Sequence, residues 1–97
     1  MTEVKLFNQF NALGNDTRLR IISYLASGEK CVCNIFQRLD LPQNLVSHHL
    51  KILRQRGFIA DRKAGKWVFY SLNKRTLFES RKFLDNIFNK TKNNLTD

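Results

Sequence analysis

The spacing of apolar residues changes twice along this chain, and the two changes restrict the folds open to it. From Leu6 to Leu53 the apolar residues recur at helical intervals, whereas residues 58–72 are rich in aromatic and β-branched side chains. The helical interval returns after Asn73. We therefore expect a mainly α fold with one β-hairpin (α+β), with its elements in the order ααααββα.

Glycine, asparagine and aspartate residues mark the ends of the first two helices. The first helix should close at Gly14, and Asn15 or Asp16 should cap the second, which should end near Gly28. The residues that we expect to face inward on this second helix are Leu19, Ile22 and Leu25.

The next two helices are separated by a short break at residues 40–42. The third helix should begin near Glu29 or Lys30, and Pro42 suits the first position of the fourth. Gly57 suits the position that follows the fourth helix. Two helices joined by so short a turn have the layout of a helix-turn-helix, which places its second helix in the major groove of DNA.

The fourth helix has two dissimilar faces. Val46, Leu50 and Leu53 form a buried seam with Leu45 beside it, and a polar set lies opposite. The candidate DNA-binding residues of that polar set are Gln43, Asn44, Ser47, His48 and Lys51. Such side chains can pair with base edges or phosphates. His49 lies between the two faces and could have a structural role, bind phosphate or bind metal. For the polar face as a whole, the alternative is an exposed amphipathic helix that binds no partner.

The predicted hairpin is basic at its tip. Arg62, Lys63 and Lys66 flank a turn in which Gly65 can adopt a positive φ, and we expect these cations to contact the DNA backbone or minor groove. Within residues 67–70 side chains alternate between two faces, and one set should reach the core. The alternative to core packing is that these aromatic rings stack on the bases of single-stranded nucleic acid.

The charge of the chain points to a polyanionic partner. The net charge is +9, and residues 41–84 hold ten basic side chains against two acidic ones. Charge alone fits nucleic acid or an anionic membrane. No apolar run approaches the roughly 20 residues that span a bilayer, and the N-terminus has no signal-peptide pattern. We expect a cytoplasmic protein with no membrane partner.

Ninety-seven residues make one domain, near the small end of what a single core stabilises. We assign this domain, for DNA binding and dimerisation, to residues 1–90. Residues 91–97 form a polar tail that we expect to fray.

Cys31 and Cys33 are the only cysteines. In a reducing compartment they are more typical of metal binding or sensing than of a disulfide, and a helix start favours the thiolate that binds soft ions. Residues two apart on a helix point about 200° apart. One ion could therefore bind both sulfurs only if the helix start were unwound.

Several separated segments together resemble the ArsR/SmtB family of winged helix-turn-helix repressors. They are ALGNDTRLRI (12–21), VSHHLKIL (46–53), GFI (57–59) and the hairpin end YSL (70–72). The resemblance implies a homodimer through the first and last helices that binds double-stranded operator DNA and is released by an inducer, with no permanent cofactor. The apolar residues available for such a dimer are Leu6, Phe10, Leu77, Leu84 and Phe88.

The thiol pair is similar to the arsenic-responsive branch of this family, whose pattern is Cys-Val-Cys-x-x-Cys. The resemblance implies As(III) or Sb(III), or another thiophilic ion, bound by Cys31 and Cys33. Phe36 stands at the third position, so a solvent thiol or another group would complete the site. The family's zinc site on the last helix looks absent, since that helix has no histidine and only Glu79 and Asp85 as carboxylates.

Other functions remain open at this point. The same cysteines could sense redox state or sulfide, or they could simply pack in a constitutive DNA-binding protein. A structural zinc site of Cys31, Cys33, His48 and His49 is disfavoured, because adjacent histidines diverge on a helix. We find no nucleophile–base–carboxylate set and expect no enzymatic activity.

Overall fold

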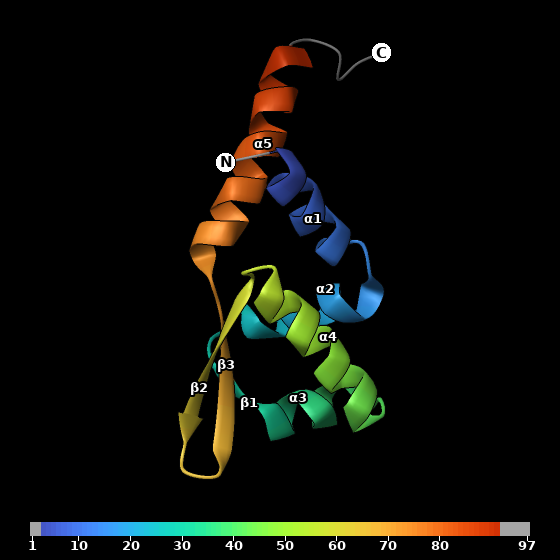
Figure 1. Ribbon diagram of the computed structural model, residues 1–97, viewed down its shortest axis with the longest axis vertical. Helices are drawn as coiled ribbons and strands as arrows, with labels where there is room; N and C mark the ends of the chain where they lie inside the picture. The colour runs from blue at the N-terminus through green and yellow to red at the C-terminus, as the bar shows by residue number, and fades with distance from the viewer. Residues whose placement is uncertain (1–2, 92–97) are drawn as a thin grey trace.

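The computed structural model describes residues 3–91 and has the predicted elements with one strand added (Figure 1). The elements are α1 (Glu3–Leu13), α2 (Asp16–Leu25), β1 (Lys30–Cys31), α3 (Val32–Leu39), α4 (Gln43–Gln55), β2 (Ile59–Ala64), β3 (Trp67–Leu72) and α5 (Lys74–Thr91). The predicted fold class is confirmed. The predicted tail begins at residue 91, the last of α5, and its other residues, 92–97, lie outside the described range.

The helix ends follow the capping residues of the sequence. Asn15 caps α2, and its side-chain oxygen accepts a hydrogen bond from the Arg18 backbone N–H at 3.1 Å. Pro42 is the N-cap of α4 and not its first helical residue, one position earlier than predicted. Gly57, with φ +82°, follows the C-cap of α4 as expected.

The core lies among α2, α3, α4 and the ends of β2 and β3 nearest to them. Its most buried residues include Ile21, Leu25, Ile35, Leu39, Val46, Leu50, Leu53, Phe58 and Ile59. The prediction for α2 was wrong at Leu19, which is 49% exposed, while Ile21 is completely buried. Residues two apart on a helix face nearly opposite directions, so burial of Ile21 against the core turns Leu19 to solvent.

A short strand that the sequence did not predict precedes α3. Lys30 and Cys31 pair antiparallel with Tyr70 and Phe69, which gives a sheet in the order β1-β3-β2. The predicted start of the third helix, at Glu29 or Lys30, was therefore wrong. The backbone of Lys30 and Cys31 pairs with β3 at the edge of the sheet, so the helix begins only at Val32.

The hairpin formed by β2 and β3 projects from the body of the molecule (Figure 1). Ala64 pairs with Trp67 across the two turn residues 65–66, and Gly65 has φ +62°. The expectation that one aromatic set is buried in the core holds only near the body. Tyr70 packs against the core, whereas Trp67, close to the tip, is 49% exposed.

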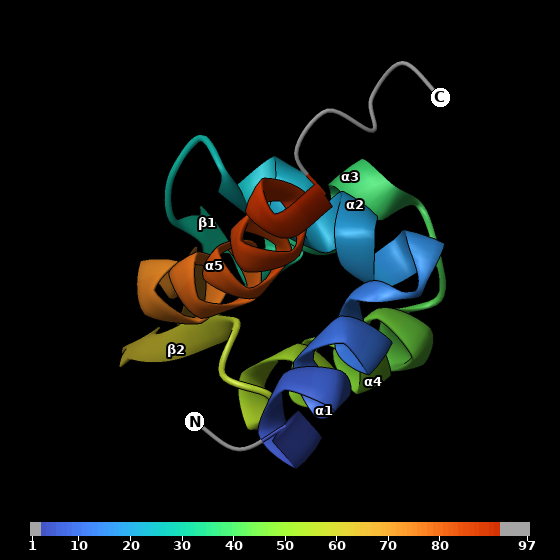
Figure 2. The same ribbon diagram turned by 90° about the horizontal axis from the view of Figure 1, so that it is seen from above.

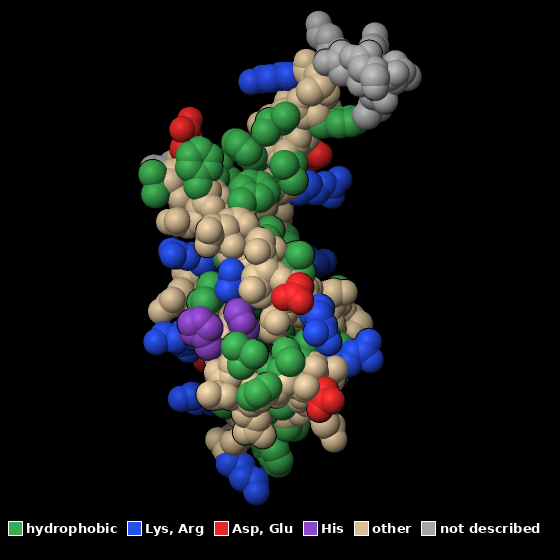
Figure 3. Space-filling view, turned by 90° about the vertical axis from the view of Figure 1, so that its right-hand side faces the viewer, with side chains coloured by type: hydrophobic (Ala, Val, Ile, Leu, Met, Phe, Trp, Pro, Cys, Tyr) green, Lys and Arg blue, Asp and Glu red, His purple; other side chains and the backbone are tan. Residues whose placement is uncertain are grey.

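Helices α1 and α5 lie together at the opposite end of the molecule from the hairpin tip (Figure 1). The Phe10 and Phe83 rings pack with centroids 5.6 Å apart. Buried Gln9 accepts a hydrogen bond from the Ser80 hydroxyl and donates one to Glu79. Figure 3 shows hydrophobic side chains gathered at this end, and the exposed ones are Val4, Phe7, Phe78, Leu84, Ile87 and Phe88. Over residues 3–91, no helix has the length and apolarity needed to cross a membrane.

Candidate DNA-binding face and thiol pair

The polar face predicted on α4 is open to solvent. All five candidate residues are exposed, while Val46, Leu50 and Leu53 on the opposite face are buried. Leu45, expected beside the seam, is 40% exposed. Figure 3 shows the two histidines of the chain on this side of the molecule, with Lys and Arg side chains nearby. The face thus offers amide, hydroxyl, imidazole and ammonium groups, which are suited to base edges and phosphates.

His49 differs from the other candidates because it is only 8% exposed. Its Nδ1 lies 3.1 Å from Nη1 of Arg18, and a guanidinium only donates, so Nδ1 is the acceptor. Burial, followed by the positive charge of Arg18, lowers the pKa of His49. A neutral His49 therefore links α4 to α2. This geometry favours the structural role among those the sequence left open, and DNA contact by His49 stays a prediction.

Arg18 is a structural residue that the sequence reading did not single out. Besides contacting His49, it donates to the backbone oxygens of Ala12 and Asn11 at the end of α1. One side chain thereby joins α1, α2 and α4. Arg18 lies in the family-like segment ALGNDTRLRI, and this was the only signal in the sequence that could have pointed to it. Its partner His49 is too distant along the chain for residue spacing to reveal the contact.

The three predicted cations of the hairpin are exposed but not equivalent. Arg62 binds both carboxylate oxygens of Glu29, at 2.7 and 3.1 Å, and lies over the Phe69 ring. Its hydrogen bond lowers the pKa of Glu29 and raises the pKa of Arg62. Lys63 lies next to Arg62 on β2, and Lys66 lies in the turn over the Trp67 ring. Arg62 is thus already paired with an anion, and its DNA contact remains a prediction.

The two cysteine sulfurs lie side by side without any unwinding of a helix. Cys31 is the N-cap of α3, with extended backbone (φ −64°, ψ 143°), and Cys33 lies in the first turn. The two Sγ atoms are 2.7 Å apart. The condition that the helix start be unwound is met without distortion of α3, because Cys31 belongs to β1 and the angular rule for helical neighbours does not apply to it.

The two thiols differ in acidity. The hydrogen bond from Cys33 lowers the pKa of Cys31, and the backbone N–H groups of Cys33 and Asn34 act in the same direction against the effect of burial. The same bond raises the pKa of Cys33. Cys31 is therefore the first thiol to ionise, at a helix N-terminus that favours a negative charge.

The donor set of this site is two thiols. Nowhere in residues 3–91 do three or more His, Cys, Asp or Glu side chains come together as a metal site. Two soft donors fit a thiophilic ion and leave room for a ligand from outside the chain. Cys33 borders an open hollow of about 470 Å³ that could admit one; its other lining residues are Phe36, Gln37, Asp40, Leu41 and Gln43.

The thiol pair lies between the two candidate DNA-binding elements. Cys31 pairs with Phe69 of β3, and the guanidinium group of Arg62 lies over the ring of that Phe69. On its other side, the hollow beside Cys33 reaches Gln43, the first residue of α4. The pair is thus joined to the hairpin by β1 and shares the border of one hollow with the first residue of α4.

Comparisons with known proteins bear on both features. The family model described as "Bacterial regulatory protein, arsR family" matches residues 15–61, which include the thiols and all of α4. The arsenical resistance operon repressor of Escherichia coli (strain K12) is 42% identical over 77 residues, covering 78% of this chain and 66% of that protein. The transcriptional repressor SdpR of Bacillus subtilis (strain 168) is 34% identical over 88 residues, covering 91% and 98%. A crystal structure of a possible transcriptional regulator for arsenical resistance superposes with a TM-score of 0.77 at 28% identity, covering 84% of each chain.

Proposed function

This chain belongs to the ArsR family of bacterial regulatory proteins, and from that premise we propose that it represses transcription until a thiophilic ion binds Cys31 and Cys33. It is a transcriptional regulator of the ArsR/SmtB family with a DNA-binding winged helix. The Escherichia coli and Bacillus subtilis relatives are named as repressors, in agreement with the expectation that this chain is not an enzyme. The inducer we favour is arsenite or antimonite.

The observation that carries the proposal is the position of the thiol pair. The two Sγ atoms are close enough for one thiophilic ion to bind both. Such an ion would tie β1, which holds Cys31, to the first turn of α3, which holds Cys33. Such binding would also require both thiols to lose their protons, and Cys31 is the more acidic of the two.

We propose that the bound ion changes the position of β1 relative to the start of α3. Since β1 is two residues long and paired with β3, its displacement would shift the hairpin. Displacement of α3 would shift the turn that leads into α4. Either movement alters the relative positions of two elements that must contact one duplex together, and so lowers the affinity for DNA.

We also propose that the active form is a homodimer through α1 and α5. Exposed apolar side chains of this number are seldom left in contact with water. Leu84 and Phe88 are each 53% exposed, and Leu6 and Phe10 are partly exposed on α1, whereas Leu77 packs partly against the core. A dimer with two-fold symmetry would present two α4 helices to a two-fold symmetric operator.

The test is the effect of arsenite on DNA affinity, measured by fluorescence anisotropy on a duplex from the promoter of the chain's own gene. Arsenite should weaken binding by wild type, and Cys31→Ser and Cys33→Ser should each bind DNA normally but respond little. Ser47→Ala serves as a matched control, expected to weaken DNA binding while retaining the response. An undiminished response in the double Cys→Ser variant would exclude the thiols as the inducer site.

Redox sensing is a second candidate, because the two free thiols are already in contact. Titration with peroxide or persulfide in place of arsenite distinguishes the two inducer classes. A constitutive regulator with purely structural cysteines would bind the duplex equally under all three treatments.

A further inference from the structure

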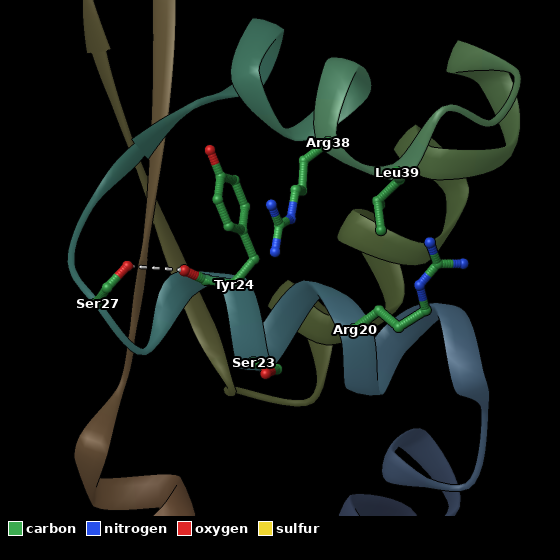
Figure 4. Close-up of a pocket in the computed structure, with 6 residues that line it drawn as sticks. All are labelled: Arg20, Ser23, Tyr24, Ser27, Arg38 and Leu39. Carbon is green, nitrogen blue, oxygen red and sulfur yellow. Dashed lines mark hydrogen bonds between the residues drawn. The ribbon is translucent and has the colours of Figure 1, made fainter.

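A polar hollow of about 650 Å³ lies between α2 and α3, apart from both the thiol pair and the α4 face. It is lined by Arg20, Ser23, Tyr24, Ser27, Arg38 and Leu39 (Figure 4). None of these residues belongs to the candidate DNA-binding set or to the hollow beside Cys33. Viewed from above, α2 and α3 lie toward one side of the molecule and α4 toward the other (Figure 2).

The hollow carries two cations and no carboxylate. Arg20 comes from α2 and Arg38 from α3, and both are exposed. Across the described range, every ion pair uses other basic residues. The nearby Glu29 is occupied by Arg62. Two arginines from neighbouring helices therefore line the hollow, and no ion pair within residues 3–91 engages either of them.

Tyr24 fixes the position of one of these cations. The guanidinium carbon of Arg38 lies 5.5 Å from the centroid of the Tyr24 ring, within the range of a cation–π contact. Figure 4 shows Arg38 reaching from α3 toward Tyr24 of α2, while Arg20 extends along the other side of the hollow, past Leu39. Lys30 adds a third positive charge 5.2 Å from the same ring, and its Nζ donates to the Ser27 hydroxyl at 2.9 Å.

We propose that this hollow binds a small phosphorylated molecule, whose phosphate is bound by Arg38 beside Tyr24, with Arg20 on the other side of the hollow adding positive charge. Guanidinium groups match phosphate oxygens with paired hydrogen bonds, and the serine hydroxyls can donate to the same group. The hollow has the size of a small-molecule site and is much larger than a bare phosphate needs. Its lining is polar and its one aromatic ring is engaged by cations, which suits a polar ester and not an apolar one.

The test is isothermal titration calorimetry of the full chain without DNA, so its outcome does not depend on the proposed repressor activity. The probes are inorganic phosphate and glycerol 3-phosphate, with glycerol as the neutral control. Both anions should bind saturably, the ester more tightly, and glycerol should not bind. Arg38→Gln should weaken ester binding by about tenfold or more, because charge-assisted hydrogen bonds are lost.

Two further variants separate a formed site from general attraction to a basic protein. Arg38→Lys keeps the charge but loses the planar fork, so it should also weaken binding several-fold. Lys63→Gln removes an equal charge on the hairpin and should change the affinity by less than about twofold. Thermal melting of each variant checks that the fold is retained.

Three results would overturn the proposal. They are no saturable binding of either anion, wild-type affinity in Arg38→Lys, and equal weakening by Lys63→Gln. A duplex titration adds a fourth: if Arg38→Gln lowers the salt dependence of DNA binding, the cation contacts DNA phosphate instead.

Discussion

The buried contact between Arg18 and His49 should make the stability of this protein depend on pH near neutrality. Burial and the Arg18 charge lower the pKa of His49 in the folded state, whereas an unfolded histidine has a pKa of about 6.5. As the pH falls, His49 is therefore protonated in the unfolded chain before it is protonated in the folded chain. The stabilisation is fully present above the unfolded pKa and is lost as the pH falls below about 6.5.

The expected slope follows from one proton. Between the two pKa values of His49, the free energy of unfolding should fall by up to about 1.4 kcal/mol per pH unit. Urea unfolding followed by circular dichroism between about pH 5.5 and about pH 7 measures it, at one protein concentration so that association stays constant. Carboxylates such as Glu29, whose pKa is lowered, titrate below this window.

The adjacent histidine supplies a matched control. His48 is exposed and on the same helix, and its charge is a lesser cause of the lowered pKa of His49 than burial and Arg18, so His48→Gln should keep most of the slope, whereas His49→Gln should flatten it. His49→Gln should also be less stable at pH 7 by about 1–3 kcal/mol, because Arg18 loses its acceptor. A slope that persists in His49→Gln, or a stability that rises as the pH falls, would refute this account.

The other predictions concern the backbone, the apolar end and the DNA-binding face. Gly57→Ala should lower the free energy of unfolding in urea by more than about 1 kcal/mol, and by more than Gly65→Ala does. Both glycines have a positive φ, but only at residue 57 would the added Cβ meet another atom, Oγ1 of Thr76 at 3.1 Å. Equal losses in the two variants would contradict this. Phe88→Glu should lower the apparent mass in sedimentation experiments, whereas Trp67→Glu, at a similarly exposed residue on the hairpin, should not; an unchanged mass would place the dimer interface elsewhere. Lys51→Gln should reduce the slope of log affinity against log salt by about 1 on duplex DNA; an unchanged slope would mean that Lys51 contacts no phosphate.

The order of helices and hairpin could be predicted because each rests on a local pattern. The helical interval, Asn15 as a cap and Gly57 after α4 are all properties of neighbouring residues. The strand β1 has no such signal. It consists of Lys30 and Cys31 only, and it exists because Tyr70 and Phe69, about forty residues later, present an open sheet edge to them.

The candidate site was predicted in composition but not in geometry. The exposed side of α4 followed from a buried seam at regular spacing, and the structure places those residues as expected. The contact between Cys31 and Cys33 could not be derived, because it depends on β1 ending where α3 begins. The pairing of Arg62 with Glu29 could likewise not be predicted from the sequence, since the hairpin and the loop meet only in the folded chain.

That pairing means that Arg62 carries an internal counterion. A lysine on the hairpin that meets a phosphate releases a cation condensed on the DNA, and this release drives attachment to any duplex irrespective of sequence. Arg62 must also give up its pair with the Glu29 carboxylate, so it gains less on random DNA than a lysine does. The effective charge of the hairpin is therefore smaller than its cations suggest. We therefore expect that removing this carboxylate, as in Glu29→Gln, would raise the affinity for random duplex DNA.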